Sequence, residues 1–180
     1  DAAAAEVIPK NKSIICQPED AGALGDQGFR NLLTSVEQAL GDDIHTKRVP
    51  AQHGHGEIAG RMAPASGYVI VGKGKKIYVA GDTVWFEGVR KTLEDYQPDV
   101  IILNSGAARF QFGDPITMTA EDVVKVALSS KPQAKVIIVH MEAINHCYLT
   151  REELRAELKA RQLLQKCVIP DDGEEIIFSF

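Results

Sequence analysis

Two of the most informative residues in the sequence follow directly on apolar runs. Asp82 comes after the run at residues 77–80, separated from it by one glycine, and His140 ends a second run at residues 136–139. Apolar runs of this length are typical of buried strands, and α/β folds place their functional groups where such strands end. The sequence therefore predicts a functional site to which Asp82 and His140 both contribute.

A third candidate region is the segment AQHGHGE, in which His53 and His55 alternate with glycine. An extended backbone would point both imidazoles to the same side, and the glycines allow another group to approach closely. Such His-x-His spacing suits metal binding. A flexible polar loop without a function is the alternative interpretation, because glycine-rich loops on protein surfaces often contain histidine.

Ordinary structural roles are available for the other two residues as well. Asp82 could cap a helix that begins after Trp85, which is a common role for aspartate. His140 on its own could be a polar side chain whose hydrogen bonds are satisfied locally. Its position beside other candidate ligands favours a functional role over this alternative.

Four further residues lie near these strand ends in the sequence. Glu142 and His146 follow His140, and His146 could orient a substrate or a metal ligand. Asn104 ends an apolar run, and Arg109 follows it in a loop of small residues. The Arg109 guanidinium could bind an anionic substrate, although an exposed surface charge is the simpler interpretation. Together with His55, these residues are our candidates for substrate contact or for support of the metal ligands.

The elements that must position these residues alternate between strand and helix patterns. The resulting order is typical of an α/β layered fold in a single domain, residues 1–180. The opening reads as a helix that proline ends, and Thr119 and Thr150 each begin a later helix with capping chemistry. We expect helices at residues 2–8, 89–96, 119–128 and 154–164, strands at 13–16, 44–49, 100–103 and 136–139, a hairpin at 68–80, and a final strand pair near 168 and 176–178.

Composition excludes several classes of function. The 180 residues carry 20 basic and 25 acidic side chains, for a formal net charge of −5, so there is no basic stripe that could bind nucleic acid. No apolar run approaches the roughly 20 residues that cross a membrane. Cys16, Cys147 and Cys167 lack the spacing of a zinc site or a disulfide framework. We expect a cytoplasmic protein with reduced thiols and a small-molecule substrate, and self-association into a homo-oligomer is left open.

Five segments together resemble the metallo-β-lactamase-fold hydrolases, in their lactonase-like branch, which includes ascorbate-6-phosphate lactonase. These segments are AQHGHGE, SGYVIVGKGKKIYVAGDTVW, PDVIILNSGAARF, ITMTAEDV and VIIVHMEAINH. The resemblance covers nearly the whole chain and implies an αββα sandwich that binds two divalent metal ions. It places metal ligands at His53, Asp82 and His140, with Asp82 as the bridge. A carboxylate suits that place because it partly neutralises two cations about 3.5 to 4 Å apart.

The sequence departs from that family at its beginning. The family's H-x-H-x-D-H cluster occurs nowhere in these residues, and the first residue is Asp1 rather than methionine. We therefore expect an N-terminally incomplete fold, the C-terminal portion of the domain, whose first ligand cluster lies upstream. The 180 residues alone are then expected to be inactive, and the full-length form to be the catalyst.

The resemblance implies a metal-dependent hydrolase. Its two metal ions, zinc or manganese, would supply a metal-bound hydroxide that attacks an ester, lactone or phosphoester bond. The alternative is a non-catalytic binding or scaffold module that kept the fold but lost the first ligand cluster. A nuclease on the same fold is disfavoured by the acidic balance and by the lack of interleaved basic and aromatic residues.

Overall fold

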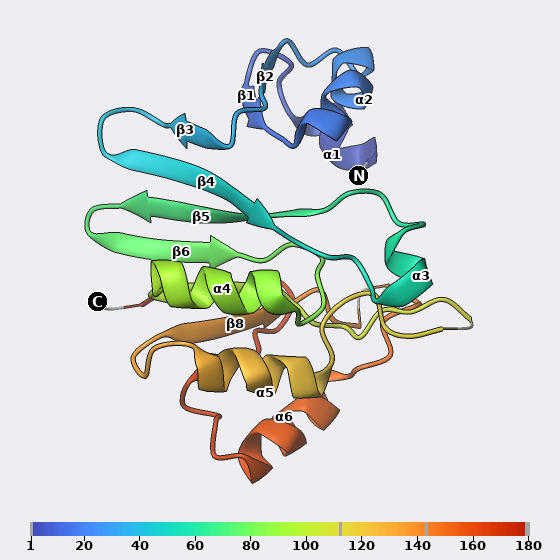
Figure 1. Ribbon diagram of the computed structural model, residues 1–180, viewed down its shortest axis with the longest axis vertical. Helices are drawn as coiled ribbons and strands as arrows, with labels where there is room; N and C mark the ends of the chain where they lie inside the picture. The colour runs from blue at the N-terminus through green and yellow to red at the C-terminus, as the bar shows by residue number, and fades with distance from the viewer. Residues whose placement is uncertain (1, 112, 143, 179–180) are drawn as a thin grey trace.

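A computed structural model describes residues 2–111, 113–142 and 144–178 (Figure 1). Its main element is a seven-stranded sheet whose strands lie in sequence order. The first four strands pair antiparallel and the last four pair parallel, with β6 belonging to both parts. These strands are β3 (Glu37–Ala39), β4 (Ile44–Pro50), β5 (Ser66–Gly72), β6 (Lys75–Val79), β7 (Val100–Asn104), β8 (Lys135–Val139) and β9 (Cys167–Val168).

The antiparallel part is a meander built on the predicted hairpin. Strands β5 and β6 pair from Tyr68 with Val79 down to Gly72 with Lys75. Only Lys73 and Gly74 connect them, with φ angles of 49° and 73°. Two consecutive positive φ angles give the turn whose twist matches that of the flanking strands. The glycine at the second position adopts a positive φ without steric strain, because it has no Cβ.

The parallel part is connected by helices, as parallel strands require. Helix α4 (Glu87–Tyr96) joins β6 to β7, α5 (Ala120–Ser129) joins β7 to β8, and α6 (Arg151–Ala160) joins β8 to β9. Both α5 and α6 begin with a capping box, at Thr119 with Asp122 and at Thr150 with Glu153. These caps satisfy backbone N–H groups that have no partner within the helix.

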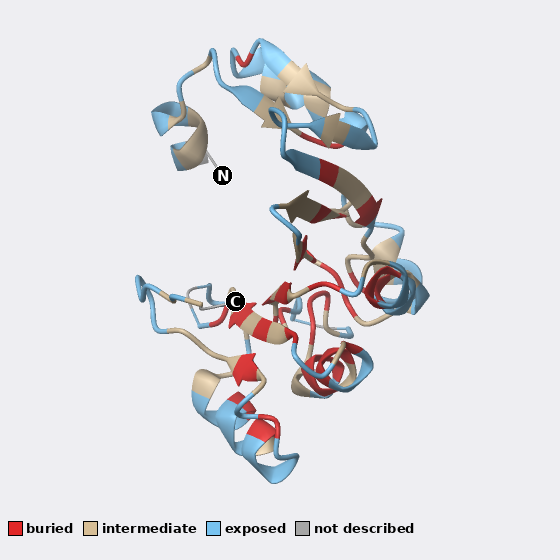
Figure 2. Ribbon diagram, turned by 90° about the vertical axis from the view of Figure 1, so that its left-hand side faces the viewer, coloured by how far each residue is buried: buried red, intermediate tan, exposed pale blue. Residues whose placement is uncertain are grey.

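The hydrophobic core lies between the sheet and one layer of helices. Figure 2 shows the sheet nearly edge-on, with buried residues where it meets α4 and α5. In β5 and β8 buried residues alternate with half-buried ones, as the period of two in a strand dictates when one face is covered more than the other. The core includes Val69, Tyr78, Val89, Leu93, Ile101, Leu103, Val123, Val126, Val136, Ile138, Leu154 and Leu158.

A small N-terminal unit lies beyond the β3 edge of the sheet (Figure 1). It contains a separate parallel pair of strands together with short helices, and a further short helix, α3 (Gly56–Ala59), follows β4. The elements of this unit are α1 (Ala2–Val7), β1 (Ser13–Ile15), the 3₁₀ helix η1 (Pro18–Asp20), α2 (Ala21–Asp26) and β2 (Asn31–Leu33).

The predicted α/β class is confirmed, and two of the predicted elements differ from the structure. The last helix ends at Ala160 rather than at residue 164, because Arg161 leaves helical geometry and Gln162 has a φ of +59°. Residues 176–178 form no strand, and β9 is the last strand of the described chain. Only the pair β1–β2 lies outside the main sheet, so the residues with described positions form one large sheet of the expected sandwich. None of the described helices has the length and apolar character needed to span a membrane.

Candidate functional site

Asp82 lies at the carboxyl end of β6, where the chain turns sharply out of the sheet. Gly81 makes this turn with a φ of +73°, and a Cβ at that position would lie 2.9 Å from the Ser66 backbone oxygen. Only glycine therefore fits between the strand and Asp82. Asp82 does not cap the following helix, because the cap position of α4 is Phe86, which makes no side-chain cap.

Asn104 fixes the Asp82 carboxylate from the neighbouring strand. Its Nδ2 donates a 2.7 Å hydrogen bond to Oδ1 of Asp82. Asn104 is the last residue of β7, and β6 and β7 run parallel, so their carboxyl ends meet at one edge of the sheet. Asp82 is half-buried there. The predicted candidate Asn104 thus contacts the predicted centre of the site directly.

His140 projects from the same edge, at the end of β8. Its φ of +60° is unusual for a residue other than glycine, and Cys147 packs against it. The Cys147 Sγ lies 3.8 Å from Nδ1 of His140 and 3.7 Å from its backbone oxygen. Burial raises the pKa of the Cys147 thiol, and the Asp82 carboxylate raises it further, so the thiol stays protonated at neutral pH.

Gly106 makes the packing around His140 possible. A Cβ at this position would lie 2.5 Å from the His140 backbone oxygen and 2.6 Å from the Cys147 Sγ. Real atoms do not approach this closely, so any larger residue would displace one or both neighbours. Neither Gly106 nor Cys147 was a candidate from the sequence, and the small residues at positions 105–108 are the signal that could have indicated a close backbone approach after β7.

His53 reaches the site from the loop that follows β4. Thr83, fully buried beside Asp82, holds this loop by accepting a 2.9 Å hydrogen bond from the Gln52 backbone N–H. The Val84 N–H donates to the Gln52 backbone oxygen in turn, also at 2.9 Å. Residue 53 and residue 82 are thereby brought side by side, although 29 positions separate them in the sequence.

The pKa of His53 depends on the charges of both Asp82 and His140. Burial lowers its pKa below the ordinary histidine value, the Asp82 carboxylate opposes this effect, and His140 adds to it. Burial dominates because it disfavours the charged imidazolium. The His53 imidazole is therefore neutral near pH 7, which is the form that binds metal ions.

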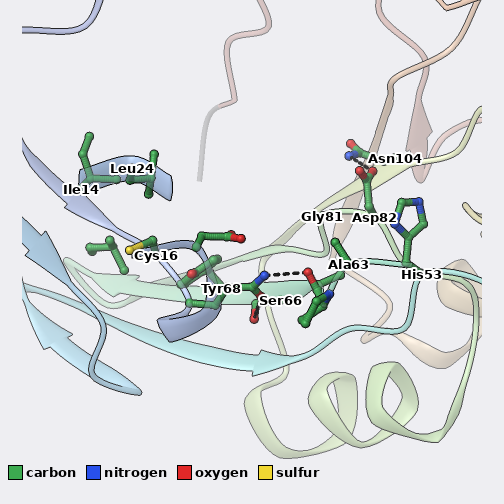
Figure 3. Close-up of a pocket in the computed structure, with 15 residues that line it drawn as sticks. Ile14, Cys16, Leu24, His53, Ala63, Ser66, Tyr68, Gly81, Asp82 and Asn104 are labelled. Atoms are coloured by element: carbon green, nitrogen blue, oxygen red, sulfur yellow. Dashed lines mark hydrogen bonds between the residues drawn. The ribbon is translucent and has the colours of Figure 1, made fainter. Parts of the chain in front are cut away.

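His53, Asp82 and Asn104 line one end of a cavity of about 560 Å³ (Figure 3). The cavity extends from these residues along the loop at residues 63–66 to the N-terminal unit. A volume of this size accommodates a small organic molecule. The edge of the sheet that carries Asp82 and Asn104 thus opens onto a space in which a substrate could bind, whereas His140 is not among the residues that line it.

Of the remaining candidates, Glu142 and Arg109 are engaged elsewhere. The Glu142 carboxylate forms a 2.6 Å ion pair with Arg151 at the start of α6. The Arg109 guanidinium lies over the ring of Tyr148, 4.4 Å from its centre, and Arg109 is exposed. Neither lines the cavity that contains Asp82.

The two flanking histidines also lie outside that cavity. His55 is exposed at the start of α3, with its Nδ1 3.4 Å from the Gln52 side-chain nitrogen. The Nδ1 of His146 lies 3.4 Å from the oxygen of the adjacent Asn145 side chain, and the backbone oxygen of His146 accepts a hydrogen bond from Arg109. Both histidines therefore lie apart from the pocket end that His53 and Asp82 form.

The donor types at the site fit a divalent metal ion, but they do not complete a metal site. Two imidazoles and a carboxylate are ordinary ligands of zinc and manganese. Among residues 2–111, 113–142 and 144–178, however, no three His, Cys, Asp or Glu side chains lie close enough together to hold an ion. The residues thus have the chemistry of metal ligands without forming a metal-binding group among themselves.

Comparison with known proteins gives consistent results for family and fold. Residues 18–141 match the model of the beta-lactamase superfamily domain. The UPF0173 protein YddR of Bacillus subtilis is 35% identical over 182 residues, which cover 99% of this chain and 71% of that protein. A UPF0173 metal-dependent hydrolase of Natranaerobius thermophilus is 34% identical over 175 residues, covering 96% of this chain and 73% of the relative.

The solved structures include a similar protein whose activity is named. It is the isothiocyanate hydrolase from Delia radicum gut bacteria, with 36% identity and a TM-score of 0.91 over 99% of this chain and 72% of that one. Homologues of this chain are thus described as metal-dependent hydrolases, a description that implies a divalent metal cofactor.

Proposed function

This chain belongs to the beta-lactamase superfamily, with the metallo-β-lactamase fold, and on that premise we propose that it acts in a metal-dependent hydrolase for ester, lactone or phosphoester bonds. The observation that carries the proposal is the arrangement of Asp82, held by Asn104, beside a neutral His53 at one end of a substrate-sized cavity. Family membership and the names of the homologues support enzymatic function over a non-catalytic scaffold.

In this proposal His53, Asp82 and His140 supply part of the set of metal ligands. Asn104 occupies one carboxylate oxygen of Asp82 and fixes the plane of that carboxylate. Cys147 lies against Nδ1 of His140, which leaves Nε2 as the nitrogen that binds metal. Two divalent ions at such a centre, zinc or manganese, would lower the pKa of a bound water to near 7 and polarise the bond under attack.

We further propose that the metal centre needs donors beyond His53, Asp82 and His140. Three donors are too few for a centre of two ions, because the common zinc enzymes use at least three protein ligands per ion, and within the described residues these donors do not gather into a group that could hold an ion. The 180-residue chain is then expected to bind metal weakly and to hydrolyse substrates poorly.

Isothiocyanates are a second candidate class of substrate, favoured by the 36% identity to the isothiocyanate hydrolase. Their central carbon is an electrophile, as a carbonyl carbon is. Water adds across the carbon–nitrogen bond to give a thiocarbamate, and this product breaks down to an amine and carbonyl sulfide. The same residues would serve this reaction, because it also needs a water nucleophile and a polarised acceptor atom.

The test compares the protein as its gene encodes it with the 180-residue chain. Each is freed of metal by chelation and then assayed with Zn²⁺ or Mn²⁺ on 4-nitrophenyl butyrate, a homoserine lactone, bis(4-nitrophenyl) phosphate and phenethyl isothiocyanate. We expect metal-restored turnover of at least one substrate by the gene-encoded protein. Equal activity before and after chelation, or no turnover of any substrate by folded metal-loaded protein, would overturn the proposal.

A further inference from the structure

The cavity beside Asp82 has two chemically different ends. Figure 3 shows His53, Asp82 and Asn104 at one end, and Ile14, Leu24 and Cys16 at the other. The second end is formed by the N-terminal unit, which supplies β1 and α2 to its wall. A substrate whose reactive group reached Asp82 would therefore place the rest of its body against the N-terminal unit.

The wall at the far end is largely apolar and carries no positive charge. Ile14, Ile15 and Leu24 contribute aliphatic surface, and the ring of Tyr68 adds an aromatic face. None of the described residues that line the cavity is lysine or arginine, and the exposed Asp20, which acts electrostatically on Cys16, contributes a carboxylate to this end. The neighbouring Arg48 acts electrostatically on Cys16 and Tyr68, but it is not part of the lining.

Hydrogen bonds fix the two walls of this cavity to each other. The buried Gln17 side chain donates from Nε2 to the Pro64 backbone oxygen at 2.6 Å. It accepts from the Ser66 hydroxyl at 2.8 Å. The N-terminal unit is thus attached to the loop that leads into β5. The far end is therefore a formed pocket whose walls cannot separate without breaking these two bonds.

We propose that the far end of the cavity binds the uncharged hydrocarbon part of the substrate and rejects a tail that carries a negative charge. This inference rests on the proposed hydrolase function and narrows its substrate class. Each methylene group removed from water strengthens binding by about fourfold, whereas an anion placed beside Asp20 would lose hydration without gaining a cationic partner. Neutral esters, lactones or isothiocyanates with an apolar body fit this pocket.

The test compares two ligands that differ only at the end of the tail. Hexanamide ends in a methyl group, and adipamate is the same chain with a terminal carboxylate. Both are titrated into the 180-residue chain with ¹³C-labelled isoleucine and leucine methyl groups. We expect hexanamide to shift the methyl signals of Ile14, Ile15 and Leu24, and adipamate to bind at least tenfold more weakly. Equal or tighter binding of adipamate, or no shift of these methyls by hexanamide, would overturn the inference.

A charge reversal tests the role of Asp20 with a matched control. Asp20→Lys is expected to improve adipamate binding severalfold relative to hexanamide, because it replaces a repulsive charge at the pocket with an attractive one. Asp26→Lys makes the same change at the end of α2 but outside the cavity lining, and it should leave the ratio unchanged. If both variants changed the ratio of adipamate to hexanamide binding equally, Asp20 would have no specific role in rejecting the charged tail.

The binding measurement does not depend on turnover. If the gene-encoded protein hydrolyses nothing while hexanamide still binds as expected, the proposed function fails and the pocket assignment stands. If the protein hydrolyses 4-nitrophenyl adipate as well as 4-nitrophenyl hexanoate, the function stands and the pocket assignment fails.

Discussion

Asn104 donates a 2.7 Å hydrogen bond from Nδ2 to Oδ1 of Asp82, joining the carboxyl ends of two adjacent parallel strands. This contact orients the carboxylate on which the proposed metal centre depends. Partners that orient a metal ligand in this way commonly affect metal affinity almost as strongly as the ligands themselves.

Removing that hydrogen bond should weaken metal binding without unfolding the protein. Asn104→Ala is expected to lower Zn²⁺ or Mn²⁺ affinity by about 10- to 100-fold, because the Asp82 carboxylate loses its fixed orientation. Isothermal titration calorimetry on the gene-encoded protein measures this. Asn31→Ala is the control, since it deletes an amide that bonds to Asn11 in the N-terminal unit. The prediction fails if both variants bind metal as tightly as the unmodified protein.

Filling the space at Gly106 should destabilise the fold around His140. A Cβ there would lie 2.5 Å from the His140 backbone oxygen, so Gly106→Ala is expected to lower the free energy of unfolding by about 1 to 3 kcal/mol. Urea denaturation followed by circular dichroism gives the value. Gly22→Ala is the matched control, because a Cβ at this position in α2 meets nothing within 4 Å, and it should be neutral or slightly stabilising. A similar loss in both variants would contradict the steric explanation.

The ion pair between Asp99 and Lys131 predicts a pH dependence of stability. Its carboxylate accepts 2.8 Å hydrogen bonds from the Lys131 ammonium group and from the Lys76 backbone N–H, and these hold the pKa of Asp99 below its usual value. A carboxyl group with a lowered pKa in the folded state stabilises the fold above its unfolded pKa of about 3.9. That stabilisation is lost as the pH falls through the folded value.

Asp99→Asn should therefore be less stable than the unmodified chain at pH 7, by about 1 kcal/mol given that the ion pair is partly exposed. The difference should shrink as the pH falls below about 3.9. Urea midpoints between pH 7 and pH 2.5 measure it, with the exposed Asp42→Asn as control. A difference that is the same at both ends of this pH range would be inconsistent with the assigned role of the Asp99 carboxylate.

Much of the fold could be predicted from the sequence because its signals are local. The runs at residues 100–103 and 136–139 are too apolar for any position but a covered sheet, and the capping boxes at Thr119 and Thr150 mark helix starts directly. The short strands β2 and β3 were not predicted, because the apolar residues of positions 29–40 have a mixed spacing that fits helix or strand equally well. The end of α6 was placed too late, because leucines beyond Ala160 continue the helical spacing after the backbone has turned.

The candidate site also has features that the sequence predicts and features that it does not. The proximity of Asp82 and Asn104 follows from adjacent parallel strands, and a sequence can indicate that adjacency. The ion pair of Glu142 with Arg151 and the ring contact of Arg109 depend on side-chain directions that no spacing encodes. The apolar wall at Ile14 belongs to the site only because the N-terminal unit folds back toward β5, and this became visible only in three dimensions.

The central claim is that Asp82 binds the metal on which hydrolysis depends. The most direct measurement compares the gene-encoded protein with its Asp82→Asn variant for Zn²⁺ and Mn²⁺ affinity and for hydrolysis, with melting curves to confirm folding. The variant keeps the size of the side chain and removes its charge. We predict that metal affinity falls by at least about tenfold and that activity falls with it, while the melting temperature of metal-free protein is unchanged. A folded variant with the metal affinity and activity of the unmodified protein would contradict the account.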